Sequence, residues 1–177
     1  MKIAIVVGHR KNSQGAVGSA GTSEYKLNTE VAKRISSRVS KHKTKIFYRR
    51  DDLSGYTERM KDLHKRIDEW GADVSVSLHF NAASNPQANG HEVLYCSGKG
   101  KKLAKKLNDK FTKYLGNKDR GIKHKTKSDR GGGFLCRGKS VCILAEPFFA
   151  AHQEKYMNGS IPSNILVSSY VDFIEEL

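Results

Sequence analysis

The chain has 177 residues, a length at which a single domain buries a sizeable hydrophobic core. It contains no run of about eighteen apolar residues, which excludes a membrane-spanning helix. There are 32 lysines and arginines against 18 aspartates and glutamates, a formal net charge of +14. Such an excess concentrates polyanions near the surface, so an anionic partner is favoured. We expect one domain over residues 1–177 and no separate binding domain.

The N-terminus and the cysteines indicate the compartment. One lysine and then five apolar residues precede Gly8, which is too short for the hydrophobic region of a secretory signal. We therefore expect synthesis in the cytoplasm without a signal peptide. Cys96, Cys136 and Cys142 show no CxxC spacing and cannot all pair, so reduced thiols that hold no metal are expected.

Strand-like and helix-like segments alternate through the first half of the chain. The predicted strands cover residues 3–7, 45–49, 74–78, 91–96 and 141–145. The predicted helices carry apolar residues at helical spacing over residues 23–39, 57–70, 98–116 and 162–177. Residues 118–133 are polar, and a mobile loop or a short strand is expected there. The alternation indicates an α/β fold: a single twisted, mostly parallel sheet of about six strands with helices on both faces.

Three of the predicted strands deliver a titratable residue at or just past their ends. His9 follows the first strand after one glycine, His79 follows the strand at 74–78 directly, and Glu146 follows the strand at 141–145. In open α/β sheets, ligands bind beyond the carboxyl ends of the strands. We therefore expect these three side chains to meet at one edge of the sheet.

Glu24 completes a candidate metal site. It lies in the first turn of the first predicted helix, after a glycine-rich loop that can fold back toward His9. Two histidines and one glutamate, with the fourth position left to water, form a catalytic zinc site. On spacing alone, the simpler interpretation of Glu24 is a first-turn carboxylate favoured by the helix dipole.

The remaining five histidines are weaker candidates for a functional site. His42, His64, His124 and His152 lie in polar or lysine-rich stretches, so solvent-exposed side chains are expected. His91 opens a strand after a loop, which places it to face a cleft at the sheet edge.

Seven short motifs support the zinc interpretation, and together they cover nearly the whole chain. They are Val7-Gly8-His9 with Gly15-Ala16, Gly21-x-x-Glu24-x-x-x-Asn28, Glu58-Arg59 before Ala72-Asp73, Ser77-Leu78-His79-Phe80-Asn81-Ala82, Gly90-x-Glu92-Val93, Arg120-Gly121-Ile122, and Ile143-Leu144-Ala145-Glu146-x-x-Phe149. In this order the motifs resemble the zinc-dependent N-acetylmuramoyl-L-alanine amidases of the amidase-3 type. That family occurs as bacterial cell-wall amidases and as phage endolysins.

The resemblance implies hydrolysis of the amide bond between N-acetylmuramic acid and L-alanine in peptidoglycan. One zinc ion would be held by His9, Glu24 and His79. Glu146 would act as general base toward water and then as general acid toward the leaving amine. A zinc peptidase that cuts within the peptidoglycan stem peptide is an alternative with the same metal site.

The resemblance also guides expectations about substrate and setting. We expect Asn81, His91 and Arg130 to contact the substrate. The missing signal peptide fits a phage-type lysin that reaches the cell wall after release from the cytoplasm.

The positive charge is concentrated in one segment. From Lys99 to Arg130 there are 13 lysines and arginines against 3 aspartates. The face with Lys101, Lys102, Lys105 and Lys106 is expected to bind an anionic polymer or lipid of the cell envelope. The alternative is a solvent-exposed helix face that has no binding partner. A basic nucleic-acid-binding protein on a vestigial zinc fold is a further alternative. It is disfavoured because the segment lacks interleaved aromatic residues for base stacking.

Overall fold

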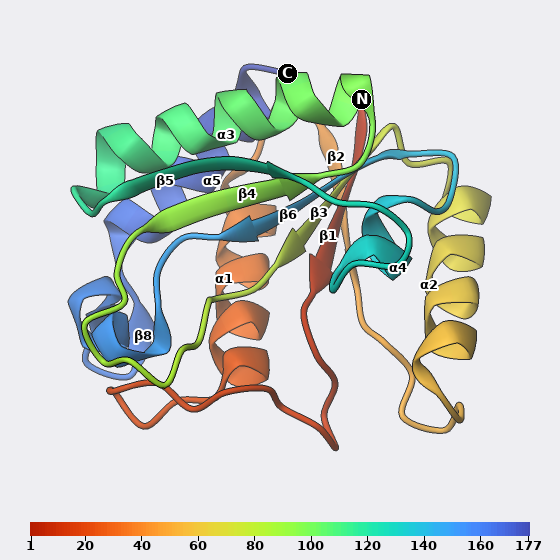
Figure 1. Ribbon diagram of the computed structural model, residues 1–177. Coiled ribbons are helices and arrows are strands. Elements are labelled where there is room, and N and C mark those ends of the chain that lie inside the picture. The colour runs from red at the N-terminus through yellow and green to blue at the C-terminus, as the bar shows by residue number, and fades with distance from the viewer.

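The computed structural model describes residues 1–177 (Figure 1). The main sheet comprises β1 (Lys2–Val7), β2 (Lys43–Phe47), β3 (Val74–Leu78), β4 (His91–Tyr95), β5 (Asp119–His124) and β6 (Val141–Glu146). The α-helices are α1 (Glu24–Arg38), α2 (Tyr56–Trp70), α3 (Gly98–Leu115), α4 (Gly132–Leu135) and α5 (Asn164–Glu175). A 3₁₀ helix, η1 (Ala150–Tyr156), precedes a hairpin of β7 (Met157–Asn158) and β8 (Ile161–Pro162). None of the helices combines the length and apolar character needed to cross a membrane.

The six strands are arranged in the order β2-β1-β3-β6-β4-β5. Neighbours from β2 to β6 are parallel, whereas β4 is antiparallel to β6 and parallel to β5. The prediction of a mostly parallel α/β sheet of about six strands is therefore confirmed. Because β4 runs in the opposite direction, its beginning lies at the same sheet edge as the ends of β1, β3 and β6.

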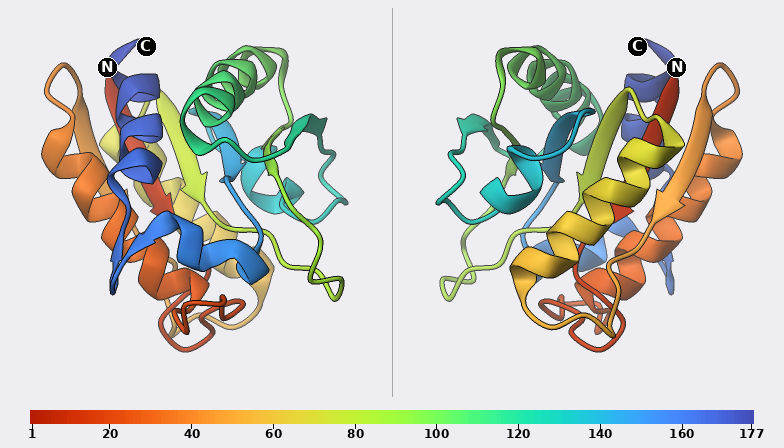
Figure 2. Two further views of the ribbon diagram at one scale, coloured as in Figure 1. Left: turned by 90° about the vertical axis from the view of Figure 1, so that its left-hand side faces the viewer. Right: turned by 90° about the vertical axis from the view of Figure 1, so that its right-hand side faces the viewer.

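Helices cover both faces of the sheet, but unequally (Figure 2). On one face, apolar strand residues pack against α1, α3 and α5 in a core of 25 buried residues. On the other face, a core of 11 buried residues packs against α2 and the short α4. The thinner cover leaves part of this second face open near the ends of β1, β3 and β6, where a cleft forms.

Capping residues define the helix ends, and the last helix starts later than its predicted range. The hydroxyl of Ser23 accepts a hydrogen bond from the backbone N–H of Lys26 and caps α1. Gly71 ends α2 in the left-handed conformation, with φ 75°. The start of the last helix was expected at Pro162, but Pro162 lies in β8. Helix α5 starts after Ser163, whose hydroxyl accepts a hydrogen bond from the backbone N–H of Leu166.

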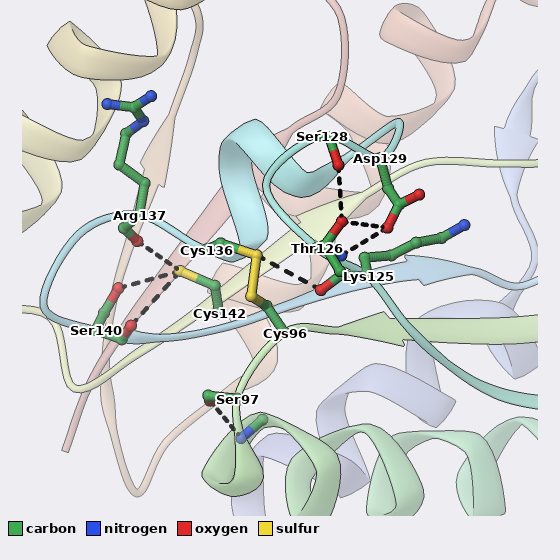
Figure 3. The surroundings of a disulfide bond; sticks show 11 residues. Cys96, Ser97, Lys125, Thr126, Ser128, Asp129, Cys136, Arg137, Ser140 and Cys142 are labelled. Carbon is green, nitrogen blue, oxygen red and sulfur yellow. Dashed lines mark hydrogen bonds between the residues drawn. A yellow bond between two sulfur atoms is a disulfide. The ribbon is translucent and has the colours of Figure 1, made fainter.

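The prediction of three reduced cysteines is wrong. Cys96, directly after β4, and Cys136, directly after α4, form a disulfide across 40 residues of sequence (Figure 3). Only Cys142 is a free thiol, and it is buried. Sequence spacing missed the pair because β5 and the loop after it carry the chain away from Cys96 and back again. The segment 118–133 accordingly contains β5 and the start of α4, joined by a loop.

We expect reduction of this disulfide to lower the free energy of unfolding by about 2–4 kcal/mol, because the bond restricts the unfolded chain. Denaturant unfolding with and without a thiol reductant measures the effect. The double variant Cys96→Ser/Cys136→Ser is the control, since reductant should leave its unfolding midpoint unchanged. Equal midpoints for the wild-type protein in both conditions would show that the bond does not stabilise the fold.

Candidate active site

Side chains from three strands turn toward the open face of the sheet. The valines and the leucine of β3 lie in the larger core, so strand alternation turns His79 to the opposite face. In β6, Leu144 lies in the smaller core, and Glu146 two residues later shares its side. In the antiparallel β4, Glu92 likewise shares the side of Leu94. The period of two therefore brings these polar groups to one place.

His9, Glu24 and His79 form one cluster. His9 Nε2 lies 3.0 Å from Glu24 Oε2, and His79 Nδ1 lies 2.7 Å from Glu24 Oε1. The two imidazole rings have their centroids 5.3 Å apart. The backbone N–H of Phe80 also donates to Glu24 Oε1, at 3.2 Å. The carboxylate at the start of α1 is thus held between the ends of β1 and β3.

The loop between β1 and α1 makes this contact sterically possible. His9 itself has φ 62°, and it is the one non-glycine residue in the left-handed region. A Cβ on Gly15 would lie 2.7 Å from Glu24 Oε2 and 2.8 Å from the His9 ring. The backbone N–H of Glu24 donates to the carbonyl of Ala16 at 2.8 Å, which closes the loop. Only a glycine at position 15 leaves room for the cluster.

The cluster fits a zinc ion. One ligand atom from each of its three residues lies within 4.8 Å of the others, and zinc ligands in a tetrahedron lie roughly 3.4 Å apart. Nε2 of His79 is buried and has no hydrogen-bond partner in the protein. Burial lowers the pKa of His79, which favours the neutral, metal-binding imidazole. Burial raises the pKa of Glu24, but hydrogen bonds from both histidines outweigh it and bring the pKa to about 2.

Glu146 lies beside this cluster, and its pKa is shifted in the opposite direction from that of Glu24. Burial, together with the negative charges of Glu92 and Glu24, raises its pKa from 4.5 to about 7. Glu92 lies directly opposite Glu146 in the β4–β6 ladder. It accepts hydrogen bonds from Asn81 Nδ2 at 3.0 Å and from Arg120 Nε at 2.8 Å. A carboxyl group that titrates near neutral pH is suited to take up and release a proton.

The raised pKa of Glu146 predicts a pH-dependent stability of the metal-free protein. The unfolded carboxyl ionises near pH 4.5, whereas the folded one resists ionisation up to about pH 7. Ionised Glu146 therefore lowers the free energy of unfolding by roughly 3 kcal/mol above pH 7, and this loss is absent below pH 4.5. We expect Glu146→Gln to be more stable than the wild type at pH 8 and about equal to it at pH 4. Denaturant unfolding at both pH values, with chelator present, measures this; a constant difference would contradict the assignment.

His9, Glu24, His79 and Glu146 all line one cleft with a volume of about 950 Å³. Asn81 and Arg130, expected to contact substrate, line the same cleft. His91 does not: its side chain is fully buried, with Nδ1 2.6 Å from Asn117 Oδ1. His91 and Glu92 point to opposite faces of β4, so only one of them can reach the cleft.

The prediction of an exposed His64 is also wrong. Its ring is buried under α4 and stacks on Phe134 with centroids 5.3 Å apart. His64 lies four residues after Met60 on α2, which places it on the inward face of the helix. The polar neighbours in sequence concealed this position. Of the other three, His124 is exposed, whereas His42 and His152 are half-buried.

Comparison with known proteins identifies the family. The family described as "N-acetylmuramoyl-L-alanine amidase" (Amidase_3) matches residues 3–175. The chain belongs to this amidase family. Its sequence is 29% identical over 128 residues to the N-acetylmuramoyl-L-alanine amidase LytC of Bacillus subtilis (strain 168). That match covers 68% of this chain and 25% of LytC, so the chain spans about a quarter of the length of this relative.

Solved structures show the same amidase-family fold. The N-acetylmuramoyl-L-alanine amidase from Clostridium difficile 630 has a TM-score of 0.79 and 25% identity, covering 99% of this chain and 95% of its own. The catalytic domain of the CD27L endolysin targeting Clostridia Difficile has a TM-score of 0.77 and 28% identity, covering 97% of each chain. The catalytic domain of CwlV from Bacillus (Paenibacillus) polymyxa var. colistinus matches at TM-score 0.78 and 22% identity, over 99% of this chain and 96% of that one.

Two further residues line this amidase-family cleft that no local sequence pattern marks as functional. Arg49 lies two residues past the end of β2 and Glu92 lies at the start of β4, and both line the cleft. Like His79, both are polar residues at the sheet edge where the parallel strands end. This shared position could be recognised only once the strand order and directions were known.

Proposed function

We propose that the protein hydrolyses the amide bond between N-acetylmuramic acid and L-alanine in peptidoglycan with the help of one zinc ion. The observation that carries this proposal is the placement of His9, Glu24, His79 and Glu146 in one cleft. Membership of the amidase family supports the bond that is cut. Two imidazoles and one carboxylate are a ligand set that catalytic zinc ions take.

Each residue has a defined task in this proposal. His9, Glu24 and His79 would hold the ion, which would lower the pKa of a bound water molecule to about 7 and polarise the scissile carbonyl. Glu146 accepts the proton of the attacking water as the new C–O bond forms. It then delivers that proton to the nitrogen as the C–N bond breaks, so that the peptide leaves as a neutral amine. A carboxyl group with a pKa of about 7 can perform both transfers at neutral pH.

The decisive experiment is the identity of the new amino terminus in digested peptidoglycan. Purified cell walls are treated with the zinc-loaded protein, and the freed amino groups are labelled and analysed by mass spectrometry. We expect newly exposed L-alanine and intact glycan chains. A new terminus at any later residue of the stem peptide would instead identify a peptidase.

The outer face of α3 is proposed as a binding surface for an anionic envelope polymer. Lys101, Lys102, Lys105 and Lys106 are all exposed, and only Lys105 is ion-paired, with Asp109. We expect the quadruple Lys→Gln variant to bind cell walls several-fold more weakly at low salt, with a flatter dependence on salt. Co-sedimentation with walls measures this, and hydrolysis of a soluble muropeptide is the control. Unchanged wall binding at every salt concentration would exclude this surface.

A further inference from the structure

Residues 125–137, here called the strap, form one wall of the cleft and are firmly anchored. The backbone N–H of Lys125 donates a 2.8 Å hydrogen bond to the end of β4, and Cys136 is joined to the same strand end by the disulfide (Figure 3). Between these points, a Cβ on Gly133 would lie 2.6 Å from the ring of Tyr56 on α2. The strap is therefore held at both ends and packed against the opposite wall.

The cleft contains several cationic side chains that have no ion-pair partner. Its cationic side chains come from the strap and from the end of β2, and they are Arg49, Lys125, Lys127, Arg130 and Arg137. None of the five forms an ion pair. Nε of Arg49 is buried and has no hydrogen-bond partner. The guanidinium lies over the Tyr56 ring, 5.7 Å from its centre, and this cation–π contact leaves the charge without a counter-ion. These cations are free to bind an anion.

The carboxylates of the cleft do not neutralise them. Glu24 is engaged by the two histidines, and Glu92 accepts a hydrogen bond from Arg120 at 2.8 Å. Asp129 turns back within the strap, where it accepts hydrogen bonds from the backbone N–H and the hydroxyl of Thr126 (Figure 3). The backbone hydrogen bond from Thr126 lowers the pKa of Asp129, so this charge is satisfied locally. Glu146, the remaining carboxyl group of the cleft, has a pKa raised to about 7 and is only partly ionised at neutral pH. The cleft therefore keeps an uncompensated positive charge.

This charge lies close to the proposed reaction centre. Lys125 and Arg130 both act to lower the pKa of Glu146, which places them within electrostatic reach of it. An anion bound to them would therefore lie close to the scissile bond. The sugar side of that bond is uncharged, whereas the peptide side carries free carboxylates.

We propose that Arg49 and the basic residues of the strap form a subsite for the free carboxylates of the stem peptide. The proposal rests on the proposed amidase function and specifies which substrates the cleft prefers. Guanidinium groups bind carboxylates through paired, charge-assisted hydrogen bonds, which an amidated stem peptide cannot make with the same strength. Arg49 and Lys125 are half-buried, so salt screens their charges less than those of the exposed lysines of α3.

Binding is tested separately from hydrolysis. The zinc-loaded Glu146→Gln protein is titrated calorimetrically with two N-acetylmuramoyl tripeptides. One has a free carboxylate on its second residue, and the other has a carboxamide there. We expect the acid to bind at least about tenfold more tightly. Adding Lys125→Gln and Arg130→Gln should remove this preference, whereas adding Lys101→Gln and Lys102→Gln, which removes the same charge from α3, should preserve it.

The outcomes separate the subsite from the reaction. Equal affinity for acid and amide, or a preference that survives the strap substitutions, would overturn the subsite. If the two tripeptides bind equally well and poly(glycerol phosphate) displaces the tripeptide that has the free carboxylate, the subsite binds polyanions in general and the proposal is overturned. If the wild-type protein cleaves neither tripeptide, the proposed amidase function is wrong, and the affinity ratio still decides whether the strap binds carboxylates.

Discussion

Replacement of His79 by alanine is expected to abolish metal binding and, with it, hydrolysis. His79 is nearly buried and contributes a ring nitrogen to the cluster with His9 and Glu24. With only two protein ligands left, zinc affinity should fall steeply, and the rate should fall by roughly three orders of magnitude or more. Metal analysis by mass spectrometry and a muropeptide assay measure the two effects. The wild-type protein should contain one zinc ion and should lose activity in chelator and regain it with added zinc.

A second variant guards against misfolding. The side chain of His9 is 24% exposed, so His9→Ala removes a ligand with less disturbance of the core. It should lose zinc and activity while keeping the unfolding midpoint of the metal-free wild type. His42→Ala is the matched control: this half-buried histidine contacts the N-terminus, outside the cleft, and should retain both metal and activity. Full activity of the wild-type protein after exhaustive chelation would falsify the zinc proposal.

Glu146→Gln should have the second largest effect, a fall in kcat of about 10²- to 10⁴-fold with zinc content unchanged. The amide keeps the shape of the side chain and removes its capacity to accept the proton of water. Since Glu146 is not part of the three-residue metal cluster, the metal should remain. Steady-state kinetics and metal analysis of the same preparation test both statements.

The position of the carboxylate, and not only its presence, should matter. Glu146→Asp keeps the charge but withdraws it from the cleft, so its rate should fall less than that of Glu146→Gln and remain well below the wild type. Glu69→Gln on the outer side of α2 is a control carboxylate, exposed and distant from the cleft lining, and should be silent. A Glu146→Gln protein with wild-type kcat would remove the residue from its assigned role.

The local features of the fold followed from the sequence because they depend on near neighbours. Strand alternation around His79 and helical spacing in α1 and α3 need only a few residues to be visible. The order of strands and helices then indicated a parallel sheet, whose carboxyl ends share one edge. The positions of His9 and Glu146 at this edge follow from that rule. Assigning Glu24 to the metal cluster also required the resemblance to the amidase family.

Features set by contacts between distant segments were missed or misjudged. The Cys96–Cys136 disulfide depends on the path of the chain through β5 and the strap, which no local pattern encodes. His64 was misjudged because its lysine-rich neighbours hid an inward position beneath α4. His91 was misjudged because the direction of β4 decides which of two adjacent residues faces the cleft.

By itself, the sequence determined the class of the fold, its strand-end residues and the family to which the chain belongs. Only the tertiary structure decided that β4 turns back against β6, and this antiparallel pairing places Glu92 opposite Glu146. It also decided that the strap crosses the thinly covered face and leaves its cations unpaired in the cleft. The physical reason is that hydrophobic periodicity reports which side of an element is buried, whereas the neighbours of that side are set by packing over the whole chain.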